Sequence, residues 1–589
     1  MSVSKKFLGD GSVFKTVAKV AICLSIVTSG VACAQSKKSE IVHDAEYYIL
    51  AAQNGERWAA EDKALDVKLA ELRKKHGRPP NIIHIMWDDT AFGDVGIRPI
   101  QQVRGLKTPN LNRMADEGIL FTRMYTEVGC TPSRAACMTG RYAIRSGMYN
   151  IGMLRESHGM RDEEVTIAEV LSRAGYATGF YGKWHLGDIE ESYPHNQGFD
   201  EALFTGYNQI LSTNTRLGER ANASIGLYED MLPEDPYRLD DTFITKGWVQ
   251  VAEGTKGGPT RQWGDNSHEN YMKIDQEAQR RTLDFIERNA TADKPFYVAT
   301  WPNMASFLPN PKKVSAARSL LQDGLQGNID PFVGRVVAKL KELGIDDNTL
   351  VVCMADNGPM SHDPPPGLGM AETIYRGGKG DFLEGGVRVP AQAWWPGTIG
   401  AGQLVGDIIH ETDLYTTFAR LAGALEYVPT DRVIDGVDQT SLLVNGDTYS
   451  RRDHVFIYAG PVLGATVKGN YKRHWISPDP VGESSGIPAA FYFLLADPRE
   501  KTPMLVNLIH LKSPFNRMKL RHDLWKKKYP DAKEVHGVPW TGIENATPEI
   551  RALAKPPLDI NKLPFDPTEY IEHLDKIPYT KGMDPGLGR

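Results

Sequence analysis

The chain has 589 residues, 41% of them hydrophobic and 24% charged, which is enough for a large core and more than one domain. A formal net charge of −6 and an isoelectric point near 6.2 give no reason to expect a nucleic-acid partner. Five cysteines in a chain of this size do not indicate a disulfide framework.

The N-terminus has the layout of an export signal. Lysines precede an apolar run at residues 20–27, small residues follow it, and the run is too short for a transmembrane helix. Ala32-Cys33-Ala34 fits a signal peptidase site, whereas residues 30–33 form a lipobox-like match that would leave Cys33 as a lipidated first residue. We favour simple export, because no large aliphatic residue stands three positions before Cys33. The protein is therefore expected to be periplasmic or secreted, and a lipid on Cys33 would be its only link to a membrane.

Composition divides the chain into five expected parts. A charged amphipathic stretch, with Leu65, Leu69 and Leu72 on one face, predicts one or two helices that end near Gly77. We expect these helices to brace the main domain from outside. The expected parts are a signal peptide at 1–34, the helical brace at 35–80, the main domain at 81–450, an α+β subdomain at 451–546 and a surface-wrapping tail at 547–589.

Two short apolar runs, at residues 82–87 and 349–355, predict buried parallel strands. Each run is followed directly by side chains that carry oxygen ligands. In an open parallel sheet such strand ends meet at one crevice, and adjacent acids there need a compensating cation. Calcium suits an irregular set of oxygen ligands, with Mg²⁺ as the alternative. The competing interpretation is that Asp88 caps a helix while Asp89 is solvated. The predicted ligands are Asp88, Asp89, Asp356 and Asn357.

The segment at residues 128–142 reads Val-Gly-Cys-Thr-Pro-Ser-Arg-Ala-Ala-Cys-Met-Thr-Gly-Arg-Tyr. Pro132 and Ser133 predict the first turn of a helix, which places Cys130 at an N-terminus that favours anions. Arg134 adds a permanent positive charge one turn later. The structural alternative is a buried cysteine where a loop meets a helix.

This segment resembles the C-x-P-S-R-x-x-x-T-G signature of the type I sulfatases, and six positions match. The resemblance implies that a maturation enzyme oxidises Cys130 to formylglycine (3-oxoalanine), which becomes the catalytic nucleophile. It also implies that the side chain at position 130 joins the four oxygen ligands around the metal ion.

Two further blocks have counterparts in the same family. A predicted helix at 163–174 and strand at 177–181 lead into Gly-Lys-Trp-His at residues 182–185, which resembles the second sulfatase signature. The resemblance implies that Lys183 contacts the sulfate or the leaving oxygen and that His185 contacts the formylglycine hydroxyls, a suitable place for a base. Residues 375–390 resemble the R-G-x-K-x-x-x-x-E-G-G-x-R-V-P block, with Lys379 as a second lysine on the sulfate.

The sequence departs from the family after the predicted strand at 294–301. Related arylsulfatases have a histidine near a methionine in the following loop, thought to protonate the leaving group, whereas here Ala305 follows Met304. Three explanations are open. His268 or His362 enters the pocket from elsewhere, the substrate has a leaving group acidic enough to depart without a proton, or the protein is a weakened relative.

The remaining elements are expected to be scaffold. Apolar spacing predicts a helix at 328–343, and another at 413–423 ends at a glycine. Residues 434–438 are predicted to loop back to the surface. Alternating runs beyond residue 451 predict a small antiparallel sheet. The polar stretch at 206–273 is expected to shape the substrate pocket.

The resemblance covers about residues 81–505. It implies an alkaline-phosphatase-like α/β fold, in which helices sandwich a large mixed, mainly parallel sheet and a smaller antiparallel subdomain follows. The implied activity is hydrolysis of a sulfate monoester on a small molecule or glycan. Two alternatives are a phosphonate or phosphodiester hydrolase of the same superfamily and a non-catalytic protein that binds sulfated glycans. The sequence does not indicate an oligomeric state.

Overall fold

The computed structural model describes residues 40–152, 158–206, 251–264, 270, 273–303, 322–359, 374–446, 448–476, 490–504 and 508–534. Several predictions lie outside these residues: the signal peptide with Cys33, the loop with Ala305, both alternative histidines, most of the stretch at 206–273, and the tail. The elements described below belong to one unit that begins at Ile41.

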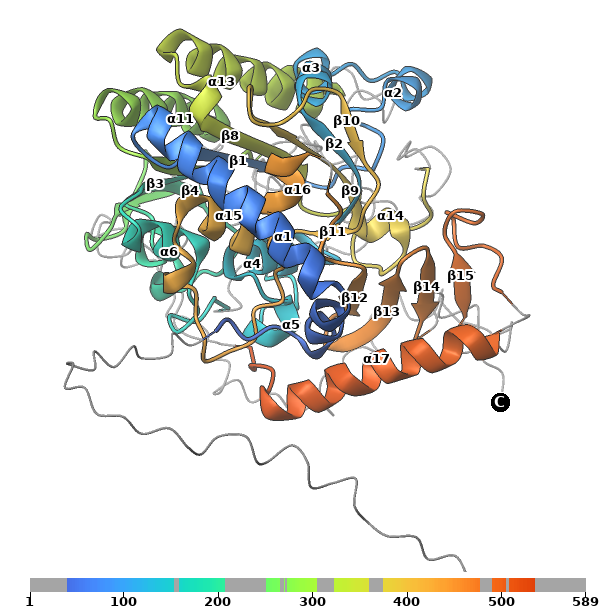
Figure 1. Cartoon of the computed structure of the whole chain (residues 1–589). Helices are drawn as coiled ribbons and strands as arrows, with labels where there is room; N and C mark the ends of the chain where they lie inside the picture. The colour runs from blue at the N-terminus through green and yellow to red at the C-terminus, as the bar shows by residue number, and fades with distance from the viewer. Residues whose placement is uncertain are drawn as a thin grey trace, which may run out of the picture. The chain divides into compact units, whose positions relative to one another are not determined.

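Eleven of the described strands form one mixed sheet (Figure 1). Its order is β10-β2-β9-β8-β1-β7-β3-β4-β5-β6, with β11 also beside β2. The central strands β8, β1, β7, β3 and β4 run parallel, while β9, β5 and β6 pair antiparallel with their neighbours. The prediction of a large mixed, mainly parallel sheet is therefore confirmed. The bounds are β1 Asn81–Trp87, β2 Ile119–Tyr125, β3 Ala177–Lys183, β4 Glu201–Thr205, β5 Ala252–Thr255, β6 Arg261–Gln262, β7 Phe296–Trp301, β8 Thr349–Ala355, β9 Arg388–Trp394, β10 Gln403–Val405 and β11 Ile409–His410.

Strands β1 and β8 lie side by side at the centre of the sheet. Every residue of both strands is buried, as expected for continuous apolar runs in a parallel sheet covered on both faces. Asn81 pairs with Thr349 at one end and Trp87 with Ala355 at the other. The two strands therefore end level, and the residues that follow them lie together at the same edge of the sheet.

Helices cover the sheet on both faces (Figure 1). Helices α3, α11 and α13 pack on one face, and α4, α6 and α15 form a connected layer on the other. Helix α6 is shorter than the predicted 163–174, because Thr166 and Glu169 form a capping box that starts the helix at Ile167. The bounds are α2 Arg98–Arg104, α3 Pro109–Glu117, α4 Cys130–Thr139, α5 Ala143–Ser146, α6 Ile167–Arg173, α11 Ile274–Thr291, α13 Asp330–Leu343, α14 Glu384–Val387, α15 Asp413–Ala422 and α16 Thr440–Asn445.

The predicted helical brace is one continuous helix, α1 (Ala45–His76), which ends at Gly77 in the left-handed conformation. Leu65 and Leu69 are buried in the main core and Leu72 packs against it. The helix also contacts α16. Among the described residues, no helix is both long enough and apolar enough to span a membrane.

A second, four-stranded antiparallel sheet lies in the C-terminal region, as predicted. Helix α17 (Leu508–Lys528) runs along this sheet (Figure 1), where the Phe515 ring meets the Phe491 ring at 5.3 Å between centroids. The strands are β12 His454–Ala459, β13 Val462–Lys468, β14 Tyr471–His474 and β15 Phe491–Phe493.

The prediction that residues 434–438 loop back to the surface is wrong. Ile434, Asp435 and Val437 are all buried. The Asp435 carboxylate accepts a hydrogen bond from Nε of Arg145 at 2.8 Å, so its charge is compensated inside the protein rather than by water.

Candidate active site

Two aspartates follow β1 directly, and an aspartate and an asparagine follow β8. All four side chains are buried, with at most 1% of each residue exposed. The Asp89 N–H donates to Oδ1 of Asp356 at 3.0 Å, which ties the two strand ends together. The interpretation of Asp88 as a helix cap with a solvated Asp89 is wrong, because no helix begins here and both acids are buried.

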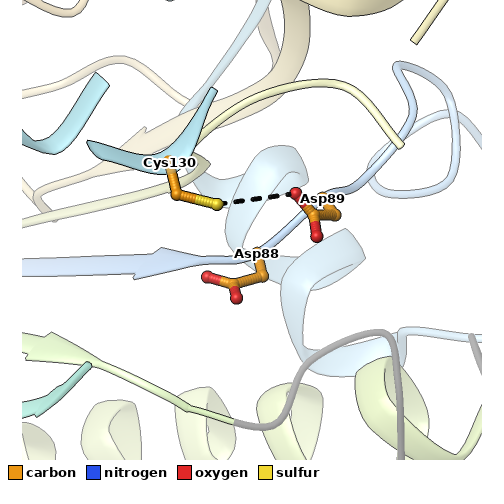
Figure 2. Close-up of side chains that lie close together, drawn as sticks. All are labelled: Asp88, Asp89 and Cys130. Carbon is orange, nitrogen blue, oxygen red and sulfur yellow. Dashed lines mark hydrogen bonds between the residues drawn. The ribbon is translucent and has the colours of Figure 1, made fainter. Parts of the chain in front are cut away.

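Cys130 is the first residue of α4 and lies over these acids. Its helix begins after Gly129, as the proline and serine of the first turn predicted. Figure 2 shows the Cys130 side chain pointing toward the Asp89 carboxylate, with Sγ 3.9 Å from Oδ1 and Asp88 beside them. Cys130 is thus buried where a loop meets a helix, and it also faces a cluster of charged side chains.

Arg134 links the strand ends from the next turn of α4. Its Nη2 donates to Asp88 Oδ1 at 2.5 Å and to Asp356 Oδ2 at 2.9 Å. Although burial disfavours its charge, these carboxylates raise the pKa of Arg134 above its ordinary value. The guanidinium carbon also lies 5.0 Å from the ring centroid of Trp301, at the end of β7. This contact was not predicted, because the two residues are far apart in the sequence.

Lys183 reaches the same acids from the end of β3. Its Nζ donates to Asp88 Oδ2 at 2.7 Å, and the side chain is completely buried. The preceding Gly182 has φ of 121°, and a Cβ there would lie 1.9 Å from the Trp301 carbonyl oxygen. Only glycine therefore lets β3 end beside β7 with Lys183 directed toward Asp88.

Lys379 approaches Cys130 from a glycine-rich loop. Its Nζ donates to Sγ of Cys130 at 2.8 Å and lies 3.0 Å from Asp89 Oδ1. Its backbone N–H donates to the Pro359 carbonyl, and the next N–H, of Gly380, donates to the Val128 carbonyl. The loop is therefore tied both to the chain after β8 and to the chain before Cys130.

His185 lies beside these groups with a strained backbone, at φ of 58°. Its Nε2 is 2.9 Å from the Gly152 carbonyl oxygen, which can only accept, so Nε2 carries the hydrogen and Nδ1 is the basic nitrogen. Gly152 in turn donates its N–H to Oγ1 of Thr131, the neighbour of Cys130. Burial, with Lys183 contributing, holds the pKa of His185 well below its ordinary value, so the ring is neutral.

The Cys130 thiol is itself a poor nucleophile. Burial is the main cause that raises its pKa to about 12; Asp356 and Asp89 add to this shift, while Lys183 and Lys379 oppose it. A thiol with this pKa is protonated near neutral pH.

The residues present fit a divalent cation. Ligand atoms of Asp88, Asp89 and Cys130 all lie within 4.8 Å of one another. Oδ1 of Asn357 is buried and has no hydrogen-bond partner among the described residues. A bound cation would give this oxygen an interaction partner. Carboxylate and amide oxygens are the donors that hard cations such as Ca²⁺ and Mg²⁺ prefer.

The structure thus brings eight of the nine predicted site residues into one connected set of contacts, and His185 lies beside them through Gly152 and Thr131. Ala305, the predicted departure from the family, lies outside the described residues.

The comparisons with known proteins agree with this site. The model of the family described as Sulfatase matches residues 80–424, more than half of the chain. N-acetylgalactosamine-6-sulfatase of Canis lupus familiaris is 35% identical over 419 residues, which cover 68% of this chain and 72% of that protein. Arylsulfatase A of Homo sapiens is 33% identical over 415 residues, covering 68% and 75% of the two chains. Among solved structures, the PsFucS1 sulfatase from Pseudoalteromonas sp. superimposes with a TM-score of 0.68 at 30% identity, covering 81% of this chain and 96% of that one.

Relatives of this similarity and coverage favour sulfate ester hydrolysis over the phosphonate, phosphodiester and non-catalytic alternatives. The chain therefore belongs to the sulfatase family, as a type I sulfatase of the alkaline phosphatase superfamily and an enzyme that hydrolyses sulfate esters.

Proposed function

We propose that Cys130 is converted to formylglycine by a maturation enzyme and that the hydrated aldehyde is the nucleophile. One observation carries this proposal: the Cys130 side chain stands at the N-terminus of α4, between the Lys379 ammonium and the Asp89 carboxylate. A group that attacks an anionic ester needs positive charge nearby, which this position provides.

The hydrated aldehyde can release sulfate after the attack, because it carries a second hydroxyl group. A thiol has no second group with which to release the sulfate. One hydroxyl attacks the sulfur atom, the bond from sulfur to the ester oxygen breaks, and the alcohol leaves with a proton. The second hydroxyl then loses its proton, the carbonyl forms again, and the bond that held the sulfate breaks. Inorganic sulfate is released, and water restores the hydrate for the next turnover.

We propose that Asp88, Asp89, Asp356, Asn357 and the side chain at position 130 hold one divalent cation, Ca²⁺ rather than Mg²⁺, because the ligand set is irregular. Bound there, the ion would act as a Lewis acid on a sulfate oxygen. Arg134 contacts two of the carboxylates and holds both in place.

Lys183 and Lys379 are the proposed sulfate ligands. Each is paired with one aspartate, and together with Arg134 they balance the three carboxylates of the crevice. A divalent ion among those carboxylates would leave the crevice positive, and both ammonium groups could then turn to an anionic ester.

His185 is proposed to accept the proton of the second hydroxyl. Its ring is neutral, and its basic nitrogen is Nδ1, because Nε2 donates to Gly152. A neutral imidazole in this position can take up a proton during the reaction and release it to water afterwards. For the histidine missing at Ala305, the three explanations are those given above: a histidine from another loop, an acidic leaving group, or a weakened enzyme.

The substrate is a sulfated molecule, and we propose a sulfated sugar as the first class to test. The support is that several relatives are named N-acetylgalactosamine-6-sulfatase.

We also propose that the enzyme is exported, because its N-terminal sequence has the layout of an export signal, with Ala32-Cys33-Ala34 as the cleavage site.

Mass spectrometry of the Cys130 peptide, from protein made in its native host, tests the central proposal. We expect the aldehyde at position 130, and its trapping by a hydroxylamine probe should remove activity in proportion to the trapped fraction. An unmodified thiol in fully active protein would disprove the proposal. Cys130→Ala serves as the control, because a methyl group can neither attack sulfur nor be oxidised to the aldehyde in the way proposed for Cys130.

A further inference from the structure

Glu500, in the C-terminal region, contacts both ends of the loop that carries Lys379. We call residues 374–387 the lysine loop. Near its start, Arg376 donates from Nη1 to the Glu500 carbonyl oxygen at 3.2 Å. Near its end, the backbone N–H of Glu384 donates to Oε1 of Glu500 at 2.6 Å. One residue therefore holds the loop at two points on either side of Lys379.

Strand β14 of the small sheet holds Glu500 in turn. Lys472 donates from Nζ to Oε1 of Glu500 at 3.2 Å and to Oε1 of Glu384 at 3.1 Å. Two residues further along the same face, Nε2 of His474 lies 2.5 Å from Oε2 of Glu500. All four side chains are buried, with at most 1% of each residue exposed, so they form a buried polar network between the small sheet and the lysine loop. Tyr125 and Arg388 also donate to Glu384 from the large sheet.

Two further features show how closely the sheet and the loop fit. Phe382 of the loop lies edge-on to the His474 ring, at 5.1 Å between centroids. On β13, a Cβ at Gly464 would come within 2.4 Å of the Phe382 ring, so the sheet leaves room for that ring only by having glycine there. Glu500 itself has φ of 53°, a conformation that a non-glycine residue keeps only when its surroundings fix it.

Between its two anchors, the lysine loop directs Lys379 at the nucleophile. The Lys379 ammonium is 2.8 Å from Sγ of Cys130, and the loop backbone bonds to Pro359 and Val128 on either side of the crevice. A small displacement of the loop would move the ammonium relative to the position of the sulfate. Displacements of about 1 Å can cost on the order of 10²-fold in rate.

We propose that Glu500, supported by Lys472, is a positioning residue for Lys379, and that the C-terminal sheet thereby sets how the crevice binds the sulfate group. The inference rests on the proposed role of Lys379 as a sulfate ligand.

A double-mutant cycle on the full-length, matured enzyme tests it. The four proteins are the parent, Glu500→Gln, Lys379→Ala and the double variant, with rates normalised to the formylglycine content of each. Glu500→Gln alone should lower kcat/KM about tenfold or more, and weaken inhibition by inorganic sulfate, because the ammonium is displaced. In the Lys379→Ala background the same change should cost less than about threefold, because residues that act as a unit are not additive.

Asp435→Asn is the matched control, since it makes the same carboxylate-to-amide change in a buried ion pair, with Arg145, that does not contact the lysine loop. Its effect on kcat/KM should be equal in both backgrounds. If Glu500→Gln gives too little folded protein, Lys472→Arg replaces it in the cycle, because it keeps the charge but moves the donor.

Two results would overturn the inference, and they differ. Equal losses from Glu500→Gln in both backgrounds would show that Glu500 acts only on general stability. Parent-like activity of Lys379→Ala alone would refute the proposed role of Lys379 and remove the basis of the inference with it.

Discussion

Trp87 and Ala355 lie side by side as the last residues of two neighbouring parallel strands, so the acids after them lie at the same level at one edge of the sheet. A single arginine nitrogen can therefore bond to both Asp88 and Asp356. The predictions below follow from this arrangement and from the groups around it.

Arg134→Met should destabilise the metal-free enzyme by about 3–5 kcal/mol, because it leaves two buried carboxylates without their shared partner. Chemical denaturation of the parent and the variant measures the difference. Added Ca²⁺ should restore part of the lost stability in the variant, since a cation among the carboxylates supplies the missing charge.

Arg134→Lys tests the geometry apart from the charge. A lysine keeps the charge but lacks the planar fork that lets the guanidinium bond to the acids, the Lys183 carbonyl and the Trp301 ring together. We expect kcat to fall about 10²- to 10³-fold, the range seen when one preorganised donor is lost. A lysine variant with parent-like kcat would show that only charge is needed at this position.

Asn357→Ala should weaken Ca²⁺ binding about 10- to 100-fold, because it removes an oxygen donor from the proposed ligand set. Calorimetric titration of chelator-treated protein measures the affinity directly, without relying on activity. Asn348→Ala, just before the opposite end of β8, is the matched control and should leave Ca²⁺ affinity unchanged. Equal affinities for the parent and Asn357→Ala would remove Asn357 from the metal site.

Glu127→Gln should change how stability depends on pH. Burial raises the pKa of Glu127 to about 8, with Asp435 adding to the shift, so its carboxyl is protonated in the folded enzyme while the unfolded chain releases the proton near its ordinary pKa of about 4.5. The parent therefore loses stability as pH rises from about 4.5 to about 8, by at most about 5 kcal/mol from this group. The glutamine of the variant does not ionise, so position 127 no longer makes its stability depend on pH.

Denaturant unfolding of both proteins at pH 5 and pH 8 tests this sign. The advantage of Glu127→Gln over the parent should be larger at pH 8 than at pH 5. Parallel stability curves for the two proteins would mean that Glu127 is ionised in the fold.

Ala305→His should separate the explanations for the missing histidine. If the natural leaving group is acidic, the parent should hydrolyse aryl sulfates with acidic phenols well and alkyl sulfates poorly. The variant should then gain about 10²- to 10⁴-fold on the poor leaving groups alone. No gain on a leaving group of high pKa would rule out this explanation and favour a histidine from another loop.

Much of the site could be predicted, because its residues follow short local patterns. Asp88 and Asp356 come at the ends of apolar runs whose parallel pairing places them together, and Cys130 stands before a proline-led helix turn. Each of these patterns spans no more than about a dozen residues, so the local sequence alone is sufficient to predict the strand ends and the helix start.

The remaining contacts depend on residues that are far apart in the sequence. The Trp301 ring at the end of β7 lies beneath Arg134 of α4, and Glu500 meets Glu384 across a gap of 116 residues. The prediction for the loop with Asp435 was wrong for the same reason. Its polar sequence suggested an exposed loop, because the sequence does not show that Arg145 pairs with Asp435 inside the protein. No local periodicity encodes these pairings.

The complete burial of Cys130 bears on the order of the proposed maturation and folding. Its side chain has no exposed surface in the fold, where Lys379 of the lysine loop contacts its sulfur atom and α15 packs against α4. If Cys130 is oxidised as we propose, the oxidising enzyme must reach the segment around it before that segment folds. A chain that folds first would then keep its thiol and lack the proposed nucleophile.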